Sequence, residues 1–198
     1  MSINLVHYLY AGFAPWFALS LLFLILFGRK GPLSPKRTFG TLLLTFLILW
    51  IPVMGWPLFR WIAVLEPNPS FLLTALLGIA LWEKIGTRKL FRPCDWRMAW
   101  IFGALAALAL YPTGLGLTLW DANSWGWRSP LPLVILLIAT ILLLRGNRFG
   151  ILLLAPFLGF LLNLQESRNF WEAILDPFYG GFALIALAAS SLRKRSQA

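Results

Sequence analysis

Two carboxylates followed by proline stand 110 residues apart in this sequence, as Glu66-Pro67 and Asp176-Pro177. An acid just before a proline suits the start of a helix, because the carboxylate accepts hydrogen bonds from free backbone N–H groups and proline fits the first turn. If the two carboxylates instead face each other across a repeat axis, their titrations are coupled, which suits binding of a cation or a proton. Helix capping is the simpler interpretation. The functional alternative is an acidic mouth, in which the two carboxylates line an opening for a cation or a proton.

The second acid has more polar neighbours than the first. Residues 165–170 read Gln-Glu-Ser-Arg-Asn-Phe, whereas the equivalent residues 55–60 read Gly-Trp-Pro-Leu-Phe-Arg. Duplicated segments diverge where one copy acquires a task, so this loop is the leading candidate for substrate or ion binding. Together with the neighbouring loop, the candidate residues are Glu66, Asp121, Asn163, Gln165, Glu166, Arg168 and Asp176.

Other chemistries find little support in the sequence. His7 and Cys94 are each the single residue of their type, so they supply neither a zinc ligand set nor an internal disulfide. Catalysis by a serine nucleophile and by an intramembrane metal is therefore disfavoured, and we expect no metal and no cofactor. A paired-carboxylate hydrolase or transferase acting on a lipid-linked substrate stays open. It would use Asp121, Glu166 and Asp176, with Arg128 or Arg168 holding a phosphate.

The two acids belong to a longer duplication. Aligned without a gap, residues 39–67 and 149–177 share nine of 29 positions, including a Phe-Gly pair, a tryptophan and the proline after each acid. Leucine richness alone does not produce these matches. The sequence therefore predicts two related units.

The composition places both units in a lipid bilayer. Hydrophobic residues make up 60% of the 198 residues and charged residues only 12%, about half the share usual in soluble domains. About seven apolar runs are candidate transmembrane helices, although several are shorter than the ~20 residues that cross a hydrocarbon core. They are residues 8–28, 38–59, 68–82, 98–119, 128–144, 149–164 and 177–192. The predicted fold class is an all-α polytopic membrane protein.

The charges predict its orientation. Most lysines and arginines follow the first, third, fifth and seventh runs, whereas only Arg60, Arg128 and Arg168 fall at the other ends. Because cytoplasmic loops collect these residues, we expect the N-terminus outside, the C-terminus inside and a bacterial cytoplasmic membrane as the location. The net charge of +10 then reflects orientation and attraction to anionic lipids at the cytoplasmic face, rather than binding of a nucleic acid.

The predicted organisation is three helices, a connector and three helices within a single integral membrane domain. Residues 1–92 form the first unit, residues 93–119 the connector and residues 120–198 the second unit, so both units face the same way. This plan is similar in topology to that of the SWEET sugar carriers. The Pro-Gln pair that marks that family is absent, since the only glutamines are Gln165 and Gln197.

Three functions from different classes fit these features. The first, which the duplication favours, is a carrier of a small solute or lipid, which moves through the junction of the two three-helix units. The second is a non-catalytic accessory or assembly protein with a membrane partner or a second copy of itself. In that case the small residues Gly103, Ala104, Ala106, Ala107 and Ala109 permit close helix contact. The third is the outer-face enzyme described above.

Overall fold

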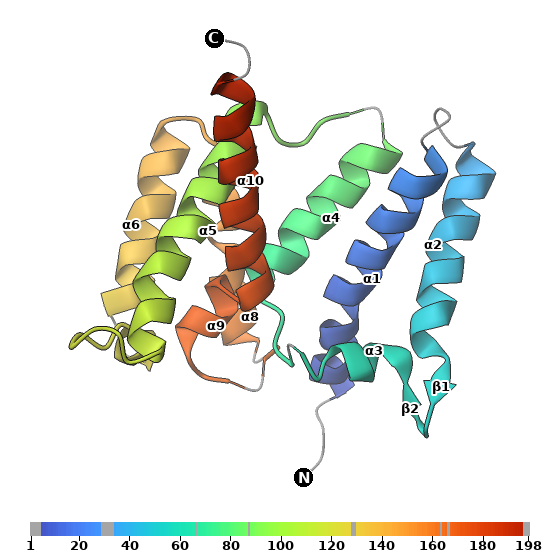
Figure 1. The fold of residues 1–198 in the computed structure, drawn as a ribbon, viewed down its shortest axis with the longest axis horizontal. Coiled ribbons are helices and arrows are strands. Elements are labelled where there is room, and N and C mark those ends of the chain that lie inside the picture. Colours follow the sequence, from blue (N-terminus) through green and yellow to red (C-terminus); the bar gives the residue numbers. More distant parts are fainter. Residues whose placement is uncertain are drawn as a thin grey trace. The chain divides into compact units, whose positions relative to one another are not determined.

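A computed structural model shows a mostly helical chain (Figure 1). It describes residues 5–28, 34–65, 67–86, 88–127, 130–162, 164–165 and 167–195. The chain divides into two compact units, residues 1–69 with 74–90 and residues 70–73 with 91–198. The predicted all-α class is therefore confirmed, whereas the internal duplication and its boundaries stay predictions.

The first unit contains α1 (Leu5–Phe27), α2 (Pro35–Trp50), α3 (Leu58–Ile62) and most of α4 (Phe71–Ile85). Polar links join α1 to α2: the hydroxyls of Ser20 and Thr45 lie 2.7 Å apart in a buried position, and the Trp16 indole donates to the Leu42 carbonyl. The short helix α3 packs against both. These links hold the two long helices together along their apolar sides.

Helix α2 ends earlier than the apolar run 38–59 predicts. Pro52 has no N–H to donate, and a small hairpin of β1 (Pro52–Val53) and β2 (Trp56–Pro57) follows. The turn residues Met54 and Gly55 both have positive φ, at 51° and 82°, as tight two-residue hairpins require. The chain then reverses into α3 instead of continuing as one long helix.

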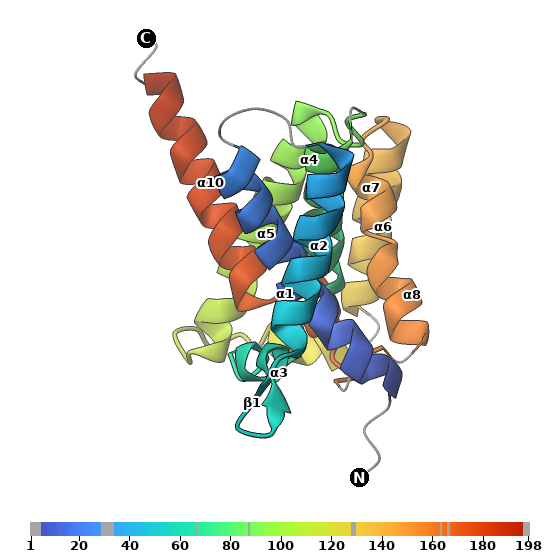
Figure 2. The same ribbon diagram turned by 90° about the vertical axis from the view of Figure 1, so that its right-hand side faces the viewer.

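The second unit contains α5 (Pro93–Gly114), the 3-10 helix η2 (Asn123–Trp127), α6 (Pro130–Leu144), α7 (Phe149–Leu152), α8 (Ala155–Leu161), α9 (Phe170–Ile174) and α10 (Pro177–Arg195). Its most extensive helix contact joins α5 to α10. The predicted connector helix thus packs within this unit. The apolar run 149–164 is split into α7 and α8, seen one after the other in Figure 2, because Pro156 has no N–H to continue the ladder.

Small residues let α5 and α10 approach closely. A Cβ atom on Gly103 would lie 2.8 Å from the Tyr179 ring, and one on Gly180 would lie 3.0 Å from the Ala107 methyl group. The Tyr179 hydroxyl donates to the Ala99 carbonyl at 2.7 Å. Gly103 and Ala107, predicted to permit close helix contact, therefore make that contact inside the second unit.

One segment within the described residues, Leu9–Phe27 of α1, is both long and apolar enough to cross a membrane. The segments Pro130–Leu144, Phe149–Leu161 and Pro177–Leu192 are apolar but shorter. A helix of 15 residues, such as α6, rises only about 22 Å against a hydrocarbon core of about 30 Å. The complete set of seven crossings therefore stays a prediction.

Candidate functional site

Asp176 lies at the start of α10, where its carboxylate is enclosed by backbone donors. One oxygen accepts the Tyr179 N–H at 2.8 Å, and the other accepts the Ser70 N–H at 2.8 Å. The side chain is only 3% exposed. Asp176 therefore caps its own helix and also holds the segment that begins α4, which belongs to the same unit.

The partner of Asp176 is itself fixed in place. The Ser70 hydroxyl accepts the Leu73 N–H at 3.1 Å and so caps the start of α4. The next residue, Phe71, presses its ring against α8, where a Cβ atom on Gly159 would lie 2.1 Å from the ring. The segment that donates to Asp176 is therefore fixed by a helix cap and by the packing of an aromatic ring.

A second polar network joins η2 to α9. The Asn169 amide donates to the Asn123 side-chain oxygen at 2.7 Å, and its own oxygen accepts the Trp171 N–H at 3.0 Å. The Trp171 indole donates to the Ala122 carbonyl at 2.8 Å. Asn169 was not among the site residues predicted from the sequence. Asparagine is a common helix-capping residue, and its place just before Phe170 could have indicated a cap. Its contact with Asn123, 46 positions away, could not be predicted from the local sequence.

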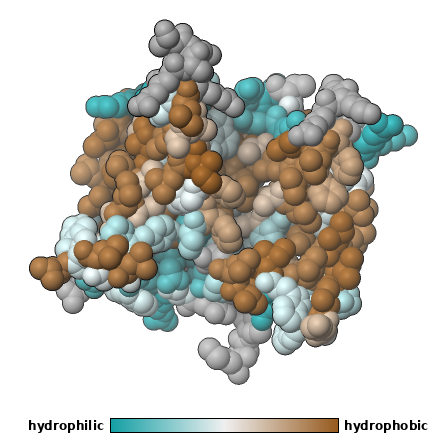
Figure 3. Space-filling view, viewed as in Figure 1, coloured by the Kyte–Doolittle hydropathy of each residue, from teal (hydrophilic) through white to brown (hydrophobic). Residues whose placement is uncertain are grey.

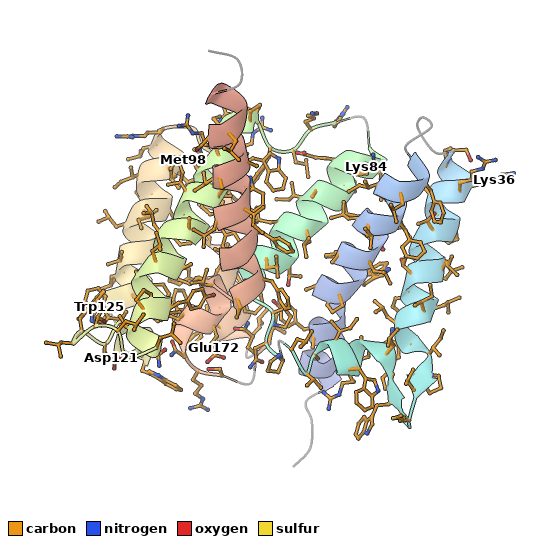
Figure 4. All side chains as sticks on the ribbon, in the orientation of Figure 1. Lys36, Lys84, Met98, Asp121, Trp125 and Glu172 are labelled. Atoms are coloured by element: carbon orange, nitrogen blue, oxygen red, sulfur yellow. The ribbon has the colours of Figure 1, made fainter. Side chains whose placement is uncertain are left out.

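Asp121 and Glu172 lie at the same end of the second unit, as Figure 4 shows with Trp125 beside Asp121. Asp121 is exposed, and one carboxylate oxygen accepts the N–H groups of Asn123 and Ser124 at 3.0 and 3.3 Å. The Gln165 amide donates to the Glu172 carbonyl at 3.2 Å. The Asp121 carboxylate and the Gln165 amide therefore stabilise the turns in which they occur.

Gly126 is the tightest point of this network. A Cβ atom there would lie 1.6 Å from the Asn169 side-chain oxygen and 2.8 Å from the Trp171 ring. We expect Gly126→Ala to lower the free energy of unfolding by about 2 kcal/mol or more, since Asn169 and Trp171 must give up their hydrogen bonds. Denaturant unfolding of the purified protein in detergent, followed by tryptophan fluorescence, measures this loss.

The matched control is Gly181→Ala in α10, where a Cβ atom would meet nothing within 4 Å. This variant should be as stable as the wild type or slightly more stable, because alanine favours a helix over glycine. Equal stability of the two variants would show that the η2–α9 network does not depend on the absence of a side chain at residue 126.

The remaining predicted site residues are distributed as follows. Arg168 is exposed, and both described hydrogen bonds of the Asp176 carboxylate come from backbone groups rather than from Arg168. Glu66, Asn163, Glu166 and Arg128 lie outside the described residues. Only Asp176 of the two repeat acids can therefore be placed, and it occupies the position that the capping interpretation predicts.

A further buried acid, which the sequence analysis did not select, lies at the other end of the second unit. Asp95 is fully buried and accepts the backbone N–H of Arg92 at 2.8 Å and that of Arg148 at 3.0 Å. The Arg92 guanidinium holds both carboxylate oxygens, at 3.1 and 3.2 Å, and also donates to the Gly146 carbonyl. Asp95 thereby ties the start of α5 to the turn between α6 and α7.

Charge and burial act in opposite directions on Asp95. Burial raises the pKa of its carboxyl group, but the hydrogen bonds from the Arg92 side chain and from the N–H groups of Arg92 and Arg148 outweigh this effect and lower the pKa. The hydrogen bond between the side chains of Arg92 and Asp95 also raises the pKa of Arg92. The pair is a fixed structural link, and its local signal was an acid three residues after Arg92, as in a capping box.

Among the described residues, no group of three His, Cys, Asp or Glu side chains could hold a metal ion. Comparison of the chain with known protein families, with curated proteins and with solved structures gives no match.

Proposed function

We propose that this chain is a multi-pass integral membrane protein with a non-catalytic, accessory role, located in a bacterial cytoplasmic membrane. The proposal rests on the hydrogen bonding and burial of the Asp176 side chain. Its carboxylate is occupied by two backbone N–H groups and is 3% exposed, so it is a structural cap rather than an open acid. A carrier mouth or a hydrolase centre needs a carboxylate that a solute or substrate can reach.

The surfaces of both units support the membrane location. Large apolar side chains are exposed along α1, α2, α6 and α10, and Figure 3 shows them covering the helices while hydrophilic residues gather toward the ends. An exposed apolar surface of this extent is costly in water and suits contact with lipid. In the first unit, Lys36 and Lys84 lie at one end (Figure 4), as the orientation rule predicts.

The single cysteine offers a direct test of membrane insertion and orientation. Cys94 is exposed and lies in the first turn of α5, at the end that is expected to face the cytoplasm. A membrane-impermeant maleimide should label it only after the cells are permeabilised. In a Cys94→Ser background, Leu119→Cys, on the opposite loop and fully exposed, should be labelled in intact cells. Labelling of both positions in intact cells, or recovery of the chain in the soluble fraction, would contradict the proposal.

The accessory role is tested separately from the location. Crosslinking in cells followed by purification in mild detergent should recover a defined membrane partner or a second copy of the chain. Proteoliposomes containing the chain should show no proton flux above that of empty liposomes, when a pH-sensitive dye is used as the reporter. A clear flux that Asp176→Asn abolishes would return the carrier hypothesis to first place.

A further inference from the structure

Helices α1, α2 and α3 of the first unit enclose a pocket of about 120 Å³. Its lining is almost entirely apolar and includes five aromatic side chains, those of Phe13, Trp16, Phe46, Trp50 and Phe59. For comparison, an engineered apolar cavity of about 150 Å³ stays dry and binds benzene. The pocket therefore suits a hydrocarbon group rather than a polar solute.

The pocket has a buried floor and an open rim. Phe59 and Leu49 form the floor and are 1% and 2% exposed, whereas Phe13 and Phe46 at the rim are 42% and 40% exposed. The rings are fixed by their neighbours: Trp16 packs edge-on against Phe46 at 5.6 Å, and Trp50 lies 5.2 Å from Phe59 between ring centroids. A rigid apolar hollow that opens on the side of a helix pair can be entered from the surrounding hydrocarbon.

Gly12 keeps this hollow open. It lines the pocket, and a Cβ atom on it would meet only the Phe59 ring, at an ordinary contact distance of 3.9 Å. Close helix packing therefore does not require glycine at this position. The missing side chain instead leaves space that the chain itself does not fill, and an unfilled space forfeits the dispersion contacts of its lining.

A cationic residue comes directly after Phe59, a residue of the pocket floor, in the sequence. Arg60 is the residue after Phe59 in α3, and its guanidinium carbon lies 5.5 Å from the centre of the Trp56 ring. Tryptophan and arginine of this kind are typical of the membrane interface. The pocket lies beside the first turns of the span Leu9–Phe27, so it begins at the depth where acyl chains meet headgroups.

We propose that this pocket holds a segment of one acyl chain of an anionic phospholipid, with the phosphate of the same molecule at Arg60. The inference rests on the proposed membrane location. The apolar lining selects a hydrocarbon chain, and the guanidinium provides the donors and the charge that a phosphate recognises. A bound lipid of this kind would fill the space between α1, α2 and α3 and stabilise the first unit.

Native mass spectrometry of the full chain, titrated with phosphatidylglycerol in detergent, tests this proposal. We expect Gly12→Leu to fill the pocket and to weaken the tightest phosphatidylglycerol binding about tenfold, equivalent to roughly two methylene groups of lost burial. Gly40→Leu is the matched control, because it places the same side chain on α2 where a Cβ atom meets nothing within 4 Å. The control should bind phosphatidylglycerol like the wild type.

The headgroup contact has its own variant. Arg60→Gln should reduce the preference for phosphatidylglycerol over phosphatidylcholine by roughly threefold, as expected for a charge that is only half-buried, while leaving phosphatidylcholine binding unchanged. Equal phosphatidylglycerol binding by Gly12→Leu and Gly40→Leu would overturn the proposal. A change of oligomeric state in Gly12→Leu at unchanged lipid binding would also overturn it, by assigning the pocket to a second copy of the chain. Either result would leave the membrane location standing if the cysteine labelling holds.

Discussion

Asp176→Ala is expected to lower the free energy of unfolding by about 3 kcal/mol, because the buried N–H groups of Ser70 and Tyr179 would both lose their acceptor. The loss combines a helix cap with a long-range link, since Ser70 lies 106 positions away in the sequence. Denaturant or thermal unfolding in detergent measures it. Asp176→Asn should lose less, because the amide keeps one acceptor oxygen for one of the two donors.

Asp121→Ala is the matched control for Asp176→Ala. Both carboxylates accept two backbone N–H groups near a helix start, but Asp121 is exposed and water can replace it. We expect its loss to cost about 1 kcal/mol or less. If Asp176→Ala were no more destabilising than Asp121→Ala, the carboxylate would not be a structural cap, and the acidic-mouth hypothesis would regain its basis.

The positions of the helices were predictable because hydropathy and proline dominate this sequence. The expected runs 98–119 and 177–192 correspond to α5 and α10, and an acid-proline pair does mark the start of α10. The proline rules also account for the two clear departures. Pro52 ends α2 before the hairpin, and Pro156 separates α7 from α8. The lengths of the helices were predicted less well than their positions, because hydropathy alone does not define the residue at which a helix ends.

The contacts of the candidate site were less predictable than its elements. Capping by Asp176 follows from local sequence, but its second hydrogen bond, to Ser70, depends on how distant segments pack. The same holds for Asn169 with Asn123 and for Asp95 with the Arg148 N–H, 53 positions away. Asp95 stands among basic residues in the sequence, and composition alone does not predict that this one acid is buried.

Asp95→Ala is expected to be the most destabilising single change at this other end of the second unit, with a loss of about 4 kcal/mol in the free energy of unfolding. Removing this fully buried carboxylate leaves the N–H groups of Arg92 and Arg148 without their acceptor and breaks the link between α5 and the α6–α7 turn. Arg92→Gln should cost clearly less, because Asp95 keeps both backbone donors. Similar losses for the two variants would assign the stabilisation to the exposed guanidinium instead.

The pH dependence of this loss follows from the lowered pKa of Asp95. A carboxyl group whose pKa is lower in the folded than in the unfolded chain contributes stability that is fully present above the unfolded value, roughly pH 4. That contribution is lost as the pH falls from there through the folded value. The gap in unfolding temperature between the wild type and Asp95→Ala should therefore be constant from pH 7 to about pH 5 and narrow below about pH 4.

Because other acids titrate in both proteins, the difference between their unfolding temperatures isolates the effect of residue 95. A gap that stays constant down to pH 3 would show that Asp95 acts through packing rather than as a charged acceptor.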